Sequence, residues 1–187
     1  MTVRVLALVG SLRAGSHNRR LAETAVRLAP ENVRISLYEG LGELPFYNED
    51  IDTEAALPEQ AARIRSAAAE ADALLLFSPE YNGTMPAVLK NAIDWLSRPY
   101  GAGAIHGKPV AVAGTAFGRY GGVWAQEEIR KAAGIAGATV LDDVKLAIPD
   151  SINRFAAAHP ADDPEVVEGL TKVIDRLAAE ISAAKAA

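Results

Sequence analysis

The strongest constraint on the fold is a regular alternation of short apolar runs with longer segments that have helical spacing. The apolar runs, rich in aliphatic and β-branched residues, occupy 3–9, 33–38, 73–77, 109–114 and 139–146. Segments with apolar residues on one helical face lie at 21–28, 58–70, 86–97, 123–133 and 166–181. Strands that alternate with helices pair in parallel through right-handed crossovers. The sequence therefore predicts an α/β fold, a doubly wound five-stranded parallel sheet of order 2-1-3-4-5 with helices on both faces.

The amino-acid composition excludes several classes of function. The chain has 187 residues, which suits one domain over 1–187, and its net charge of −5 predicts no nucleic acid partner. It has no cysteine, which excludes disulfides, thiolate catalysis and zinc–thiolate sites. Its three histidines are too scattered in sequence to indicate a metal site. No apolar run is long enough to span a bilayer, so we expect no membrane partner and a cytoplasmic location.

The loop after the first strand, GSLRAGSHN at 10–18, has the composition of a phosphate site. Glycines allow the backbone to approach a ligand, and the loop opens a helix whose first amides have no internal partner. Its polar side chains are Ser11, Arg13, Ser16 and Asn18. Ser16 and His17 stand where a Walker loop needs lysine and a magnesium-binding hydroxyl, so a Mg–nucleotide is not expected. Ordinary helix capping explains the same residues equally well.

The loop after the third strand, SPEYNG at 78–83, is suited to a flat ring. Pro79 stiffens its entry, Gly83 permits positive φ, and Tyr81 can pack against a heterocycle. Ligands of doubly wound sheets bind outside the carboxyl ends of the strands, where this loop meets the phosphate loop. A tight strand-to-helix turn with a surface tyrosine is the alternative interpretation.

Three further expectations concern apolar residues. The helix at 86–97 has a second apolar side at Val88 and Trp95, which predicts contact with a partner subunit; a neighbouring helix of the same chain is the alternative. Trp124 is expected in the core. Phe46 and Tyr47, large for a loop, indicate that their loop packs at a subunit interface near the ligand.

These motifs resemble those of the NADPH-dependent FMN reductase family, which includes quinone, chromate and azo-dye reductases. The resemblance rests on GSLRAGSHN, SPEYNGTMPAVLKNAIDWLSR, LPFYNEDID and GTAFGRYGG, and extends to about residue 141. It implies a flavodoxin-like fold, non-covalent FMN, and homodimers or homotetramers. It implies that the FMN phosphate is held by Ser11, Arg13, Ser16, His17 and Asn18. It implies that the isoalloxazine is lined by Pro79, Glu80, Tyr81, Asn82 and Gly83, and closed in by Thr115, Gly118, Arg119, Tyr120, Gly121 and Gly122.

The resulting hypothesis is an NAD(P)H-dependent FMN-containing oxidoreductase. Either NADPH or NADH would reduce FMN, which would pass two electrons to a small acceptor: a quinone, an azo compound, chromate or free flavin. No side chain is expected to act as a nucleophile. A flavodoxin-like electron carrier and a non-catalytic FMN-binding module are the alternatives. Carriers tend to use strong single-sign charge to steer their partners, whereas 24 acidic residues here oppose 19 basic ones.

Overall fold

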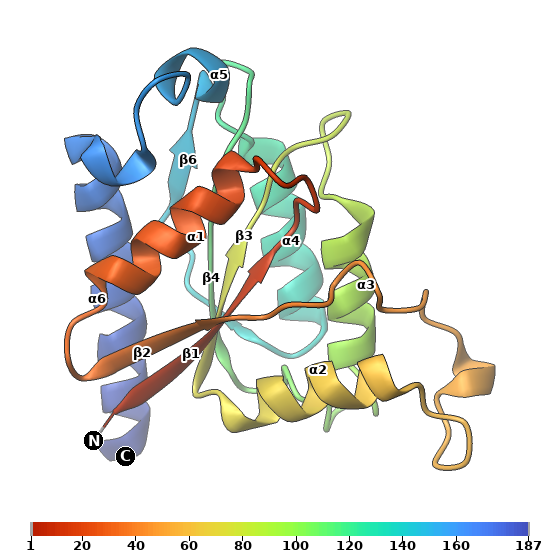
Figure 1. Cartoon of the computed structure of the whole chain (residues 1–187). Coiled ribbons are helices and arrows are strands. Elements are labelled where there is room, and N and C mark those ends of the chain that lie inside the picture. Colours follow the sequence, from red (N-terminus) through yellow and green to blue (C-terminus); the bar gives the residue numbers. More distant parts are fainter. Residues whose placement is uncertain (1, 187) are drawn as a thin grey trace.

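A computed structural model describes residues 2–186 and has the expected parallel sheet at its centre (Figure 1). The strand order is β2-β1-β3-β4-β5, with β6 also paired to β4, and every pairing is parallel. The strands are β1 Val3–Val9, β2 Val33–Leu37, β3 Ala73–Phe77, β4 Pro109–Thr115, β5 Thr139–Val140 and β6 Leu146–Ile148. The central strands β3 and β4 are buried along their whole length, as expected for a sheet covered on both faces.

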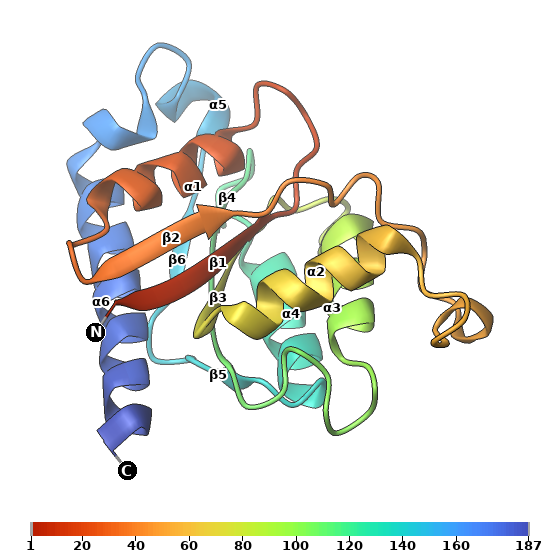
Figure 2. The ribbon, with the colours of Figure 1, turned by 60° about the horizontal axis from the view of Figure 1, so that its bottom comes forward.

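Helices cover both faces of the sheet, as predicted (Figures 1 and 2). The helices are α1 His17–Leu28, α2 Glu59–Glu70, α3 Ala87–Leu96, α4 Val123–Ile135, α5 Ser151–Arg154 and α6 Pro164–Ala186. Helices α1 and α6 pack in one apolar cluster on one face, and α2, α3 and α4 pack in a second cluster on the other. Among the described residues, no helix is both long and apolar enough to cross a membrane.

The fifth strand differs from the prediction. Instead of one strand over 139–146, the short strands β5 and β6 pair with opposite ends of β4. The polar pair Asp142 and Asp143 forms a turn between them. In the gap, the buried guanidinium of Arg130 donates a 3.1 Å hydrogen bond to the carbonyl of Val112. A side chain thus satisfies a central-strand carbonyl that a continuous fifth strand would have paired.

The predictions for the two tryptophans have different outcomes. For Trp95 the structure agrees with the alternative, contact with a neighbouring helix of the same chain, because the residue is fully buried within its own chain. Its indole donates to the carbonyl of Pro45 at 2.7 Å and packs between Tyr47 and Arg65 of α2. Trp124 was expected in the core, and that prediction is wrong, because the residue is 49% exposed. It lies on the exposed side of the first turn of α4, whereas the next residue, Ala125, is fully buried.

A close backbone approach joins the ends of β3 and β4 and yields a stability prediction. Gly114 lies against Ser78, and a methyl group added there would overlap the Ser78 carbonyl oxygen and stand 3.2 Å from Oδ1 of Asn18. We expect Gly114→Ala to lower the free energy of unfolding by about 3 kcal/mol through overpacking. Chemical denaturation measures this change. Gly118→Ala is the matched control, because nothing lies within 4 Å of its added methyl group. A tolerated Gly114→Ala would contradict this account.

Candidate functional site

A cavity of about 690 Å³ opens at the carboxyl edge of the sheet, where the predicted loops meet. The turns after β1, β3 and β4 border it, together with the short helix α5. Of the predicted residues, Ser11, Arg13, Ser16, His17, Asn18, Pro79, Glu80, Tyr81 and Thr115 line it. Its further lining residues are Gly15, Arg20, Ala116, Phe117, Ser151, Ile152, Phe155 and Ala156.

One end of the cavity is cationic. Arg13 and Arg20 both line it, and neither forms an ion pair with another residue that the structure describes. Gly15 leaves room for Arg13, since an added methyl group would stand 3.3 Å from the guanidinium. Sequence reasoning missed Arg20, although it follows His17 by three residues and shares its helical face. With the first amides of α1, these side chains form a donor set suited to a dianion.

Helix capping fixes how α1 enters this site. The hydroxyl oxygen of Ser16 accepts a 3.2 Å hydrogen bond from the Arg19 amide, so Ser16 is the N-cap of α1. Burial, together with the charges of Arg13 and Arg20, lowers the pKa of His17, which favours the neutral imidazole. Arg19 is held by Glu39 and Glu23 on the outer side of the helix and does not line the cavity.

Asn18 is a brace between the phosphate loop and β4. Its carboxamide accepts from the Thr115 amide at 3.0 Å and donates to the Thr115 carbonyl at 2.9 Å. The residue is 4% exposed, and both bonds are buried. This pairing occupies both ends of the side chain, so its amide group holds the start of α1 against the end of β4.

The turn after β3 is a two-residue hairpin. Tyr81 and Thr84 exchange backbone hydrogen bonds of 3.1 Å in both directions. The central residues Asn82 and Gly83 have φ of 53° and 75°, which is the left-handed pair of a type I′ turn. Pro79, Glu80 and Tyr81 therefore line the cavity, whereas Asn82 and Gly83 form the tip beyond it.

The turn after β4 contributes less to the cavity than predicted. Thr115, Ala116 and Phe117 line it, whereas Gly118, Arg119, Tyr120, Gly121 and Gly122 do not. Gly121 packs against the backbone of β6, and Gly122 is the N-cap of α4. The guanidinium of Arg119 stacks on the Tyr120 ring, 4.6 Å from its centroid.

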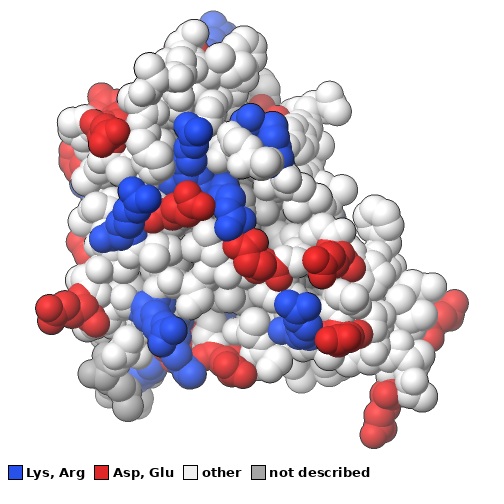
Figure 3. All heavy atoms as spheres, in the orientation of Figure 1, with Lys and Arg blue, Asp and Glu red and all other residues white. Residues whose placement is uncertain are grey.

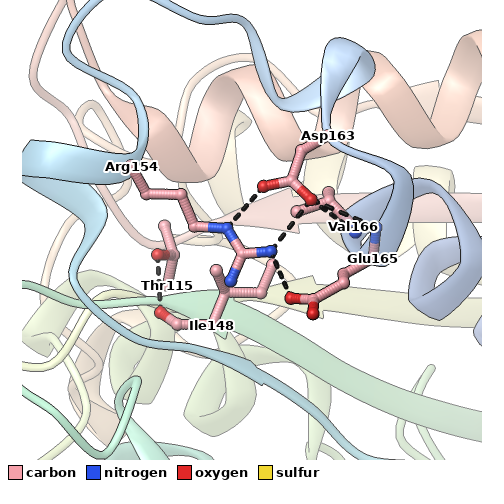
Figure 4. Close-up of polar contacts among 6 residues, drawn as sticks. All are labelled: Thr115, Ile148, Arg154, Asp163, Glu165 and Val166. Atoms are coloured by element: carbon pink, nitrogen blue, oxygen red, sulfur yellow. Dashed lines mark hydrogen bonds and ion pairs between the residues drawn. The ribbon is translucent and has the colours of Figure 1, made fainter.

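The wall formed by α5 could not be anticipated from local sequence. The Ser151 amide donates to the Ala116 carbonyl at 3.1 Å, and the Phe155 ring meets His17 edge-on at 5.5 Å. Arg154 anchors this wall to the start of α6 through hydrogen bonds of 2.5 and 2.9 Å to Asp163 and one of 2.6 Å to Glu165 (Figure 4). Figure 4 also shows the Thr115 hydroxyl donating to the Ile148 carbonyl, which joins β4 to β6.

The cavity fits a phosphorylated, flat ligand such as FMN. The guanidinium groups of Arg13 and Arg20, the Ser11 hydroxyl and the first amides of α1 suit a phosphate on the side of the loop after β1. Pro79, Tyr81 and Phe117 contribute apolar surface from the turns after β3 and β4, and Tyr81 and Phe117 are 50% and 68% exposed. Ligand sites of this size and mixed lining are usual for cofactors.

The Asn18 brace yields a prediction. Asn18→Leu keeps the approximate volume but leaves the Thr115 amide and carbonyl buried without partners, so we expect a loss of about 3 kcal/mol in the free energy of unfolding. Thermal or chemical denaturation measures it. Asn153→Leu is the control, since the Asn153 side chain bonds only to Asp150 at an exposed position. Equal stability of Asn18→Leu and the parent protein would refute the brace.

The Arg154 anchor yields a pH dependence. Hydrogen bonds from Arg154 lower the pKa of Asp163 in the folded protein. Its stabilisation is therefore fully present above the unfolded-state pKa, near 3.9, and is lost as the pH falls through the lower folded pKa. Asp163→Asn keeps a helix cap without the charge, and we expect it to cost about 2 kcal/mol at pH 6. Denaturation at several pH values should show this difference shrinking below pH 4.

Glu165→Gln provides the control for the anchor. The Glu165 side chain is 82% exposed, and exposed ion pairs contribute little. We therefore expect a change below about 0.5 kcal/mol at every pH. A pH-independent cost of Asp163→Asn would show that capping, rather than charge, holds α5 in place.

Comparisons with known proteins agree with this geometry. Residues 3–152 match the model of the NADPH-dependent FMN reductase family. A 2-hydroxy-1,4-benzoquinone reductase of Burkholderia sp is 35% identical over 179 residues, which cover 96% of each chain. A quinone reductase of Pseudomonas putida is 46% identical over 127 residues, 68% of this chain and 67% of that one. FerB of Paracoccus denitrificans, a flavoenzyme NAD(P)H:(acceptor) oxidoreductase, superimposes with a TM-score of 0.86 at 32% identity and covers 97% of this chain and 98% of its own. The chain therefore belongs to the NADPH-dependent FMN reductase family of oxidoreductases, whose cofactors are FMN and a nicotinamide nucleotide.

Proposed function

We propose that residues 1–187 form one FMN-binding domain whose edge cavity holds the cofactor of an NAD(P)H-dependent quinone reductase. The observation that carries this proposal is that one cavity is lined by two guanidinium groups on the side of α1 and the loop after β1, and by exposed aromatic rings from the turns after β3 and β4. Ser11, Arg13, Arg20 and the backbone amide of His17, next to the Ser16 N-cap, would hold the phosphate. Bound FMN supplies the redox chemistry, accepting a hydride equivalent and passing two electrons to the acceptor.

The protein's own residues would position the flat part of the cofactor. Pro79, Glu80 and Tyr81 would border it from the β3 side, with Asn82 and Gly83 at the tip of the hairpin. Thr115 and Phe117 would border it from the β4 side, with Gly118, Arg119, Tyr120, Gly121 and Gly122 as the outer part of that wall. In this proposal Asn18 acts by fixing the distance between the two sides rather than by touching phosphate.

A quinone is the acceptor class that the surroundings favour. Tyr81 lines the cavity and is about half exposed, and Trp124, which lies against the tip of the same hairpin, is exposed to the same extent together with its neighbour Tyr120. Such surface suits a flat apolar molecule. The 2-hydroxy-1,4-benzoquinone reductase of Burkholderia sp supports the same class. Acidic and basic side chains are intermixed over the face drawn in Figure 3, whereas a carrier that docks by charge would gather one sign.

We also propose a homodimer or homotetramer, on the strength of one exposed ring. The Phe46 side chain is 78% exposed, while the neighbouring Tyr47 packs on Trp95. The contact between Tyr47 and Trp95 thus fixes the loop, and the Phe46 ring next to it points away from the protein. The expected cytoplasmic location stays a prediction.

The phosphate end gives the sharpest test of this function. We expect the wild-type protein to bind FMN, to show flavin absorbance that bleaches with NADPH or NADH, and to reduce 1,4-benzoquinone. Arg20→Gln should raise the dissociation constant for FMN about tenfold or more, because it removes a charge-assisted hydrogen bond. Arg27→Gln, an exposed change of equal charge in the last turn of α1, should stay within about twofold, as surface charges are screened. Wild-type protein that neither binds added FMN nor oxidises NAD(P)H would refute the proposal.

A further inference from the structure

Glu80 makes a contact that joins the two turns flanking the cavity. Its carboxylate accepts a 3.1 Å hydrogen bond from the backbone amide of Ala125, in the first turn of α4. The N-cap of that helix is Gly122, which has φ of 85° and no side chain to cap the amides. The Glu80 side chain, from the turn after β3, therefore caps the N-terminus of α4, which has no capping side chain of its own.

A second carboxylate holds the far end of the same hairpin. Glu128, one turn further along α4, accepts hydrogen bonds from the Thr84 hydroxyl and from the Met85 amide, the latter at 3.4 Å. Between these two contacts, the Trp124 ring lies against Gly83, 3.9 Å from where a β-carbon would stand. The hairpin is thus fastened to α4 at both ends and covered at its tip.

The two carboxylates differ in their relation to the cavity. Glu80 lines it and is half-buried, whereas Glu128 is exposed and is not among the lining residues. The N-terminus of a helix carries a partial positive charge that favours anions nearby. The negative Glu80 carboxylate offsets this partial positive charge. It does so beside the place where a bound electron acceptor would gain negative charge. No Lys, Arg or His pairs with Glu80 in the part of the chain that the structure describes.

We propose that Glu80 is a positioning residue with a second effect on redox potential. It fixes the cavity-lining hairpin to α4, and its charge makes FMN in the cavity harder to reduce. This inference rests on the proposed function, because it takes FMN as the ligand. Neutralising one charge near a partly buried group changes an equilibrium by about 1.4 kcal/mol at an effective dielectric constant near 20, which is a factor of ten.

Separate variants test the charge and the contact. Glu80→Gln keeps an oxygen that can accept from Ala125 but removes the charge. We expect it to bind oxidised FMN within about threefold of wild type and reduced FMN about tenfold more tightly. For a two-electron couple, this difference raises the midpoint potential by about 30 mV. Equilibration with a redox dye measures the potential. Glu127→Gln, the same change at an exposed residue of the same helix, should leave the potential unchanged.

Glu80→Ala removes both charge and contact, and its readout needs no cofactor. We expect hydrogen exchange at the Tyr81, Thr84 and Ala125 amides to become at least tenfold faster than in Glu80→Gln, measured on the protein without FMN. Binding of oxidised FMN should weaken about tenfold because the hairpin is no longer preorganised. Equal exchange rates in the two variants would overturn the positioning role.

The outcomes separate this inference from the proposed function. If wild type binds FMN and Glu80→Gln leaves its potential unchanged, the charge effect is wrong and the proposed function stands. If wild type binds no FMN, the proposed function and the charge effect fail together, while hydrogen exchange still decides whether Glu80 fastens the hairpin.

Discussion

The candidate site depends first on the paired hydrogen bonds between Asn18 and Thr115. These residues are 97 positions apart, and their two bonds are buried at the carboxyl edge of the sheet. One bond satisfies the amide of a strand end and the other its carbonyl, so neither group is left buried without a partner. Because Asn18 is in the first turn of α1, the same contact sets where the phosphate-end amides point relative to β4. The cationic end of the cavity is consequently fixed by a side chain that sequence alone would assign to the ligand.

The opposite side of the cavity is fixed by a different device. Ser78, just after β3, and Gly114, near the end of β4, bring the two segments into close backbone contact. Beyond that point the chains diverge, and the Tyr81–Thr84 hairpin and the start of α4 are rejoined by Glu80 and Glu128. Because β3 and β4 are tightly packed where they end, the Glu80 and Glu128 carboxylates bridge only a short distance between the hairpin and α4. Preorganised walls of this kind reduce the ordering cost of ligand binding.

Strand positions, sheet order and the two main loops could be predicted because each depends on local pattern. Apolar runs define β1, β3 and β4, and Asn82-Gly83 is a turn signal with a specific backbone requirement. Apart from Arg20, which its helical spacing from His17 could have indicated, the missed features depend on contacts between distant segments. Nothing near Asn18 in sequence indicates that Thr115 would occupy its carboxamide, and α5 is held beside the cavity by the Arg154 anchor and by the Ser151–Ala116 hydrogen bond. The fifth strand divides because Arg130, on α4, can satisfy the carbonyl of Val112. Trp95 is buried by a loop that precedes it by 50 residues, a distance that periodicity cannot address.

Two neighbouring arginines of α1 have different roles, one in holding the structure and one in the cavity. Arg19 and Arg20 are neighbours at the start of α1, yet only Arg19 meets acidic partners, since Glu39 and Glu23 lie on its side. That pairing raises the pKa of Arg19 and occupies its donors. Arg20 faces the cavity with Arg13, and these two charges, with burial, favour the neutral form of His17. The cations that line the cavity therefore come from α1 and the loop before it, and the Glu80 carboxylate comes from the turn after β3. A ligand with a dianionic tail and an electron-accepting ring would be attracted at its tail by these cations. Negative charge added to its ring would be repelled by Glu80. A cofactor that is tightly held and readily reoxidised requires this arrangement of charge.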